Sequence, residues 1–146
     1  MTATATAWRF RVRCRKGEQW YYRVTVVSTA AEMVKYDEAM GPGARSRLQQ
    51  DERLRAKTYH YSSRTRPSRY CIGEMLFNRE KLEFEYVAHE AAHAALRWAK
   101  VDKSRSDGLF WGKREPEEAV CGVVGRLTQC IIVRTQRLAK KEKRRR

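Results

Sequence analysis

The N-terminal part of the chain alternates between apolar and polar positions with a period of two. Over residues 8–14 every second residue is apolar and the residues between them are Arg, and a similar alternation extends over residues 20–26. This period is typical of strands that bury one face. An antiparallel hairpin over residues 8–27 would place every large apolar side chain on that face. The predicted cross-strand pairs are Cys14 with Trp20, Val12 with Tyr22 and Phe10 with Val24.

The same register places Arg11 directly opposite Arg23 on the polar face of the hairpin. A like-charge pair in this position is mildly destabilising unless an anion or an acidic side chain lies beside it. Two interpretations of this cationic face are therefore open: a solvated surface, or a surface that binds an anion.

Beyond the hairpin the apolar pattern predicts mainly helices. Thr29 and Glu32 form a capping box, and Pro116 stands at the first position of a helix whose apolar residues recur every three or four positions. Residues 70–77 have the apolar and aromatic composition of a strand. Residues 44–68 hold few apolar residues, so a polar helix followed by a mobile basic segment is expected there. The predicted helices cover residues 29–40, 44–57, about 82–100 and about 116–133, and the third strand covers Tyr70–Phe77.

The chain of 146 residues is strongly basic, with 32 Lys and Arg against 17 Asp and Glu and a formal net charge of +15. Its length suits one domain with a core of its own. The charge indicates an anionic partner but does not define a fold. Residues 134–146 hold eight basic residues and one acidic residue, so they contribute +7 and the other 133 residues contribute +8. We therefore expect a domain over residues 1–133 and a basic C-terminal tail over residues 134–146.

The sequence pattern disfavours secretion and membrane spanning. The first residues lack the apolar centre of a secretory signal, and no run of about 18 apolar residues occurs. We expect a cytoplasmic protein without a membrane span. The four Cys residues show no CxxC spacing, which favours structural thiols over metal ligands or disulfides.

Residues 89–93 have the sequence His-Glu-Ala-Ala-His, the HExxH pattern, within the helix expected over about 82–100. Residues four apart share one face of a helix, so His89 and His93 can both bind one Zn²⁺ while Glu90 stands beside the metal. Two of the three histidines in the chain belong to this motif. The alternative is a pair of surface histidines without a metal. The pattern predicts a zinc site, which needs a third ligand.

Residues 117–125, about 25 residues after His93, read Glu-Glu-Ala-Val-Cys-Gly-Val-Val-Gly at the start of the last predicted helix. An HExxH motif followed by such a Glu-Ala pair, with a small residue seven positions after the Glu, resembles the gluzincin group of zinc metallopeptidases. The wider pattern over residues 70–132 is similar to small zincin-like proteins of phages and mobile elements. The metzincin extension of the motif is absent, since Leu96 and Ala99 occupy its Gly and His positions.

The resemblance implies that Glu90 is the general base. It implies the zinc ligands His89, His93 and Glu118, with Glu117 as the runner-up for the third position. The alternative for either downstream Glu is a charge that favours the helix N-terminus. The implied fold is α+β, a minimal zincin-like domain in which a small N-terminal antiparallel sheet packs on the HExxH helix and on the Glu-bearing helix. The implied activity is zinc-dependent hydrolysis of a protein or peptide, and the implied origin is a phage or mobile element.

Peptidases of this kind usually bind substrate along a strand edge and donate a hydrogen bond to the scissile carbonyl. For the strand we expect residues 70–77, immediately before the HExxH helix. Gly122 and Gly125 would let the two metal-bearing helices approach closely or are ordinary packing residues. The apolar loop 108–112 is expected to be a substrate wall or a separate hydrophobic anchor. The candidate donors, each also compatible with an ordinary loop or core role, are His60, Tyr59, Tyr61 and Tyr70.

Positive charge forms the second functional feature. Clustered Lys and Arg bind nucleic acid without sequence preference, so a DNA-associated or acidic protein is the expected substrate. The rival to an enzyme is a basic nucleic-acid-binding or inhibitory interaction protein on a zincin scaffold without catalysis. The residues expected to contact nucleic acid are Arg9, Arg11, Arg13, Arg23 and the 134–146 tail.

Overall fold

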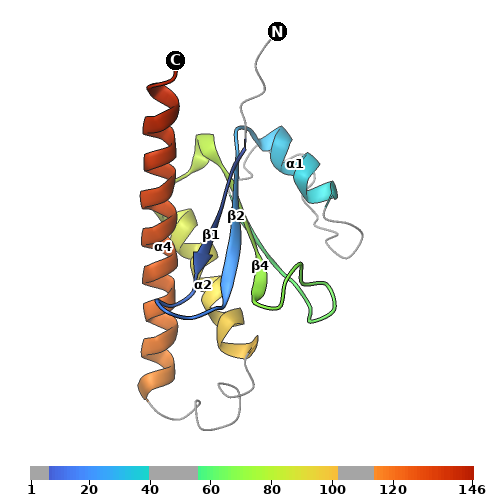
Figure 1. Cartoon of the computed structure of the whole chain (residues 1–146), viewed down its shortest axis with the longest axis vertical. Helices are drawn as coiled ribbons and strands as arrows, with labels where there is room; N and C mark the ends of the chain where they lie inside the picture. Colours follow the sequence, from blue (N-terminus) through green and yellow to red (C-terminus); the bar gives the residue numbers. More distant parts are fainter. Residues whose placement is uncertain (1–6, 40–55, 102–113) are drawn as a thin grey trace.

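The computed structural model describes residues 7–39, 56–101 and 114–146, with side chains in the last range from residue 117 onward. In these ranges a sheet of four strands is accompanied by three α-helices and one turn of 3-10 helix (Figure 1). The elements are β1 (Trp8–Arg13), β2 (Tyr21–Val27), α1 (Ala30–Ala39), β3 (Ala56–His60), β4 (Cys71–Asn78), η2 (Arg79–Lys81), α2 (Phe84–Val101) and α4 (Arg114–Lys143).

The N-terminal hairpin has the register that the alternating pattern predicts. β1 and β2 are antiparallel, with Phe10 opposite Val24 and Arg11 opposite Arg23. This register is well determined, because a slip by one residue would move every buried side chain to the other face. The predicted like-charge pair is therefore present in the folded protein.

The sheet is mixed, with the strand order β1-β2-β4-β3. β2 and β4 are parallel, and the other two pairs are antiparallel. The prediction of a small antiparallel sheet built from the hairpin and one further strand is therefore wrong. The chain passes from β2 through α1 to the far edge of the sheet as β3, and returns as β4 between β3 and β2 (Figure 1). β3 runs in the direction opposite to β2, and β4 is antiparallel to β3, so β4 lies parallel to β2.

Strand β3 lies where the sequence pattern predicts the end of a polar helix and the start of a mobile segment. Residues 40–55, which include most of that predicted helix, lie outside the described residues. The prediction is wrong for residues 56–60, because pairing with β4 supplies hydrogen bonds that local composition does not reveal. The strand-favouring pair Thr58-Tyr59 was the local signal for it.

One face of the sheet packs against α2 and α4. Trp98 of α2 is fully buried in this core, and its indole N–H donates to Glu18 Oε2 at 2.9 Å. Small side chains on the same helix let it lie close to its neighbours. The buried alanines of α2 are Ala91, Ala94, Ala95 and Ala99.

The opposite face of the sheet is partly covered by α1 and holds two buried carboxylates. Glu74 of β4 is 1% exposed, and Asp37 of α1 accepts from the Tyr59 hydroxyl and forms a 3.1 Å ion pair with Lys57. Hydrogen bonds compensate the cost of burying these carboxylates and attach α1 to the sheet. The donors to Glu74 are the hydroxyls of Thr25, Tyr36 and Tyr61.

Helix α4 continues ten residues beyond the predicted end of the domain at residue 133. Thr135 is 3% exposed, and Glu142 forms a 3.0 Å ion pair with Arg79, just before α2. Residues 134–143 therefore belong to the packed domain, and the predicted boundary between domain and tail does not coincide with a structural one.

Helix α4 also covers the outer edge of β1 (Figure 1). Arg126 Nε donates to the Arg13 carbonyl at 3.1 Å, and the Arg134 guanidinium donates to the Arg11 carbonyl at 2.9 Å. Arg134 also lies over the Phe10 ring, 5.5 Å from its centroid. Carbonyls that have no partner strand are satisfied in this way, which protects an edge that could pair with another chain.

Candidate functional site

The two histidines of the HExxH motif converge on the surface of α2. His89 Nε2 and His93 Nε2 are 3.1 Å apart, and the ring centroids are 4.7 Å apart. Both side chains are exposed, so a ligand can reach them from solvent. Helical spacing accounts for this arrangement, since residues four apart stack on one face.

Glu90 points inward from the same turn and is 8% exposed. Its Oε2 accepts a 2.5 Å hydrogen bond from Thr58 Oγ1 on β3. Since burial of a charged group is costly unless it is hydrogen-bonded, this contact both compensates Glu90 and fixes its orientation. The acidic residue of the motif is thus held between α2 and the edge of the sheet.

The third histidine of the chain lies next to this turn. His60, at the end of β3, has its Nδ1 3.3 Å from the Tyr22 hydroxyl. That hydroxyl donates to the Ala94 carbonyl of α2 at 3.1 Å. A hydroxyl has one proton to donate, so the shared hydrogen with His60 comes from the imidazole. The geometry favours the Nδ1–H tautomer of His60, with Nε2 as an acceptor.

The environment keeps His60 neutral. Partial burial, and then the charges of Arg97 and His93, lower the pKa of His60 to about 4. Arg97 lies one turn beyond His93 on α2, and its buried Nε has no hydrogen-bond partner among the described residues. Sequence reasoning included His60 among four candidate donors but did not combine Arg97 with the motif. The four-residue spacing of His93 and Arg97 was the available signal for Arg97.

This pKa shift predicts a pH-dependent stability. The unfolded chain has His60 near its ordinary pKa of 6.5, whereas the folded pKa is about 4. Between these values the unfolded state binds the extra proton, so stability is complete above pH 6.5 and falls as the pH drops towards 4. The variant His60→Asn can still hydrogen-bond to Tyr22. We expect its melting temperature to change less with pH over this window than that of wild type. Equal pH slopes for the two proteins in thermal unfolding would contradict the assignment.

The other candidate donors lie elsewhere. The Tyr59 and Tyr61 hydroxyls bond to Asp37 and Glu74 on the sheet face that α1 covers. The Tyr70 ring packs edge-on against another aromatic ring at a centroid distance of 5.5 Å. Of the four predicted candidates, His60 is therefore the one that lies beside the HExxH turn.

Glu117 and Glu118 are exposed near the start of α4. Helix α4 packs against α2 and β1, whereas the HExxH turn faces β3 at the opposite edge of the sheet. Among residues 7–39, 56–101 and 117–146, no group of three or more His, Cys, Asp or Glu side chains is close enough to hold a metal ion. The described structure thus does not bring either Glu together with His89 and His93, and the third ligand remains a prediction.

Gly122 and Gly125 do not mediate a close helix contact in the described part of the chain. A methyl group added at either position would meet no described atom within 4 Å, and both residues are exposed. The expectation that they allow α2 and α4 to approach closely is wrong. The alanines of α2 supply the small surface instead.

The strand predicted to bind substrate is internal. β4 pairs with β2 on one side and with β3 on the other, so it has no free edge for a peptide. The edge strand beside Glu90 is β3, which contributes Thr58. Residues 108–112, the predicted apolar wall, lie outside the described part of the chain.

Comparisons of the chain with protein-family models, with curated proteins and with solved structures give no match. No helix in the described ranges is long and apolar enough to cross a membrane. Cys14 and Cys71 are buried, as expected for structural thiols, whereas Cys121 is exposed. Function must therefore be argued from the site itself.

Proposed function

We propose that the protein is a zinc-dependent peptidase whose metal is held by His89 and His93 and whose general base is Glu90. The observation that carries the proposal is the 3.1 Å separation of the two imidazole Nε2 atoms beside a buried, oriented carboxylate. A third ligand is required, and Glu118, with Glu117 as runner-up, remains the prediction.

The histidine pair fits zinc by its geometry and its donor type. Two nitrogens bound tetrahedrally at about 2.0–2.1 Å from a zinc ion lie about 3.3 Å apart. The observed separation is close to this value. Bound zinc would supply a Lewis acid that polarises a carbonyl and makes water more acidic near neutral pH.

The chain's own residues then have distinct tasks. Glu90 accepts a proton from the attacking water and returns it to the departing amine. Thr58 holds the Glu90 carboxylate in place through its hydroxyl. Arg97 offers positive charge near His60 and His93, which suits it to the oxygen of the scissile carbonyl.

A peptide is the substrate class that the surroundings favour. β3 pairs with β4 along one edge and has no strand on its other edge among the described residues. An extended peptide can add to such an edge through main-chain hydrogen bonds. This position would carry the peptide past Thr58 and His60 and therefore past the HExxH turn.

Zinc binding provides the direct test. We expect the purified protein to bind one zinc ion per chain, measured by native mass spectrometry and calorimetry, and His89→Asn and His93→Asn each to weaken binding strongly. Both histidines are exposed, so the variants are expected to unfold at the wild-type temperature. Lack of stoichiometric zinc in the wild-type protein would overturn the proposal.

The neighbouring glutamates form a matched pair for the third ligand. We expect Glu118→Gln to lower zinc affinity by at least about tenfold, as loss of a ligand or of its support does, and Glu117→Gln to leave it unchanged. The reverse result would identify Glu117. Unchanged affinity in both variants would exclude this segment as the source of the ligand.

A further inference from the structure

We propose that the outer face of β1 and the adjoining stripe of α4 form a surface that binds the phosphate backbone of a nucleic-acid duplex. The surface consists of a row of arginines on β1 and a stripe of basic residues on α4, and we call it the basic face. Its members are Arg9, Arg11, Arg13, Arg137, Lys141 and Arg144, all of which are exposed.

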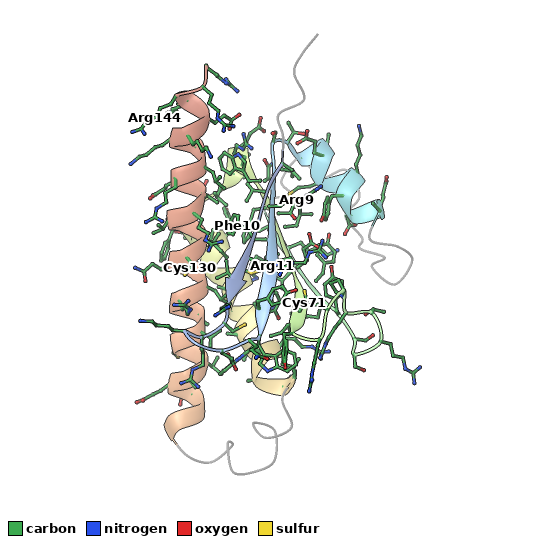
Figure 2. The ribbon with its side chains drawn as sticks, in the orientation of Figure 1. Arg9, Phe10, Arg11, Cys71, Cys130 and Arg144 are labelled. Atoms are coloured by element: carbon green, nitrogen blue, oxygen red, sulfur yellow. The ribbon has the colours of Figure 1, made fainter. Side chains whose placement is uncertain are left out.

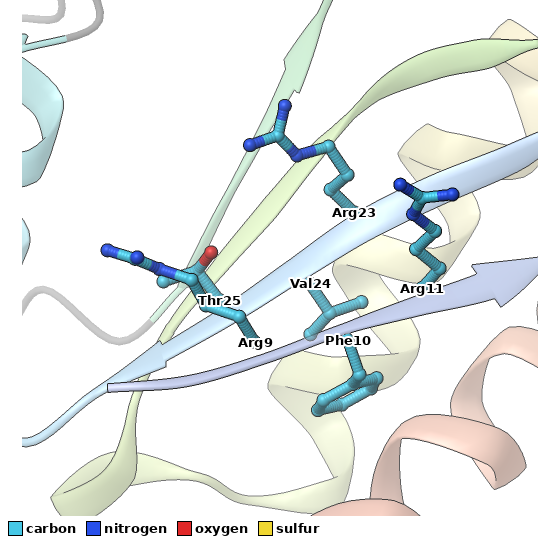
Figure 3. A pocket seen from close by; sticks show the side chains of 6 residues that line it. All are labelled: Arg9, Phe10, Arg11, Arg23, Val24 and Thr25. Atoms are coloured by element: carbon cyan, nitrogen blue, oxygen red, sulfur yellow. The ribbon is translucent and has the colours of Figure 1, made fainter. Parts of the chain in front are cut away.

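The arginine row on β1 is held in place without acidic partners. Arg9 and Arg11 lie over the Tyr36 and Tyr21 rings at 6.0 and 5.1 Å from the centroids. No ion pair joins either arginine or Arg13 to an acidic side chain of the described residues. Figure 3 shows the guanidinium groups of Arg9 and Arg11 on one side of the strands and the Phe10 ring on the other. The charges are thus oriented but not neutralised.

The cross-strand pair of Arg11 and Arg23 concentrates positive charge on one side of the hairpin. Directly opposed like charges destabilise a sheet, and the hollow they line also contains Arg9. Partial burial disfavours the charge of Arg23, but the neighbouring Glu74 carboxylate raises its pKa overall. Glu74 also accepts hydrogen bonds from three hydroxyl groups. Among the described residues no acidic side chain forms an ion pair with Arg11.

The stripe on α4 extends the row. Arg134, Arg137, Lys141 and Arg144 follow one another at spacings of three and four, which places them on one helix face. Arg134 donates to the Arg11 carbonyl at 2.9 Å and lies over the Phe10 ring, so the stripe runs along the edge of the strand that carries the row. Figure 2 shows α4, with Arg144 near its C-terminal end, beside the strand that carries Arg9 and Arg11.

Two arginines of α4 have a different task and must be separated from the basic face. Arg126 and Arg134 satisfy carbonyls at the edge of β1. Their replacement is expected to destabilise the fold, so it would not test binding. The Arg11 side chain is exposed and lies over the Tyr21 ring. Its replacement removes charge while leaving the backbone carbonyl that accepts from Arg134.

The spacing and composition favour a duplex over other anions. Successive arginines on one strand face are about 6.8 Å apart, which is close to the rise of two nucleotides along one strand of a duplex, about 6.8 Å. Guanidinium groups match phosphate oxygens in a forked geometry. An anionic membrane would be expected to meet apolar side chains next to the charges, but the exposed large apolar residues of the described chain, Phe84 and Leu96, lie on α2.

The test measures the salt dependence of duplex binding. A fluorescein-labelled 20-base-pair DNA is titrated with the full chain between 50 and 200 mM NaCl and followed by anisotropy. We expect Arg9→Gln and Arg11→Gln each to reduce the slope of log K against log salt by about 0.9, as loss of one phosphate contact does. Lys141→Gln tests the stripe in the same way. The melting temperature of Arg11→Gln should equal or exceed that of wild type, because a repulsive pair is removed.

The matched control is Arg64→Gln, which removes one exposed charge from the loop between β3 and β4. We expect it to leave the slope unchanged. Equal slopes for Arg11→Gln, Arg9→Gln and wild type would overturn the proposal. The proposal would also be overturned if Arg9→Gln and Arg11→Gln weakened binding to polyglutamate or to phosphatidylserine vesicles more than binding to DNA. That result would identify an acidic protein or a membrane as the partner. This outcome does not depend on the zinc site, since the arginine row lies on β1, at the opposite edge of the sheet from β3 and the HExxH turn.

Discussion

Replacing Glu90 with Gln is expected to lower peptide hydrolysis by about 10²–10⁴-fold, the contribution that a positioned general base makes. Gln keeps the size of the side chain and an oxygen that can accept from Thr58, so the contact between α2 and β3 should persist. The rate is measured as cleavage of a random-sequence peptide mixture, followed by mass spectrometry, with zinc bound to both proteins.

Glu90→Gln separates catalysis from zinc binding and from stability. His89 and His93 are unchanged, and we expect zinc affinity and melting temperature to match those of wild type. Thr58→Val serves as a positioning control, expected to lower turnover less than Glu90→Gln does while leaving zinc affinity intact. If zinc binds and Glu90→Gln cleaves as fast as wild type, the metal is structural and the rival function, a binding or inhibitory protein on the same scaffold, is favoured.

The largest effect on stability is expected at Gly73. A methyl group at this position would lie 2.0 Å from the Tyr59 carbonyl oxygen and 2.8 Å from the Tyr22 ring. The nearest atom belongs to the backbone of β3, so the clash is removed only if β3 moves away from β4. Gly73 lies opposite His60 of β3 in the register. We expect Gly73→Ala to lower the free energy of unfolding by about 3 kcal/mol and the melting temperature by about 10 °C.

Two glycines of α4 provide the matched control. Gly122 and Gly125 lie in a helix, where an added methyl group meets no described atom within 4 Å. Gly122→Ala and Gly125→Ala are therefore expected to raise the free energy of unfolding by about 0.5–1 kcal/mol each, since Ala is the better helix former. Denaturant unfolding of the three variants measures the contrast. A Gly73→Ala protein as stable as these would contradict the close approach of β3 and β4.

Local patterns were sufficient where one face of an element is buried and the other is solvated. The alternation around Phe10 and Val24 predicted the hairpin and its register, and the capping box at Thr29 predicted the start of α1, whose Glu32 N–H lies 3.2 Å from Thr29 Oγ1. β3 was missed because it is short and gains its hydrogen bonds from a strand distant in the sequence. The end of α4 was missed because its basic composition hides the burial of Thr135.

The candidate site shows the same division. Spacing alone predicted that His89 and His93 share a helix face, and the 3.1 Å separation of their Nε2 atoms is in line with it. Spacing gave no information about the partner of Glu90, about the neutral state of His60, or about which of several carboxylates lies near the motif. Those depend on how strands and helices that are far apart in the sequence pack together.

The sequence by itself determined the period-two hairpin, the positions of α1, β4 and α2, the HExxH pair on one helix face, and the opposed charges of Arg11 and Arg23. Each follows from the fixed periods of strands and helices, which act over a few residues. Tertiary structure alone decided that β4 is internal, that β3 forms the edge beside Glu90, and that α4 covers the edge of β1. These outcomes depend on which buried faces pair across long stretches of chain, and no local period specifies that choice.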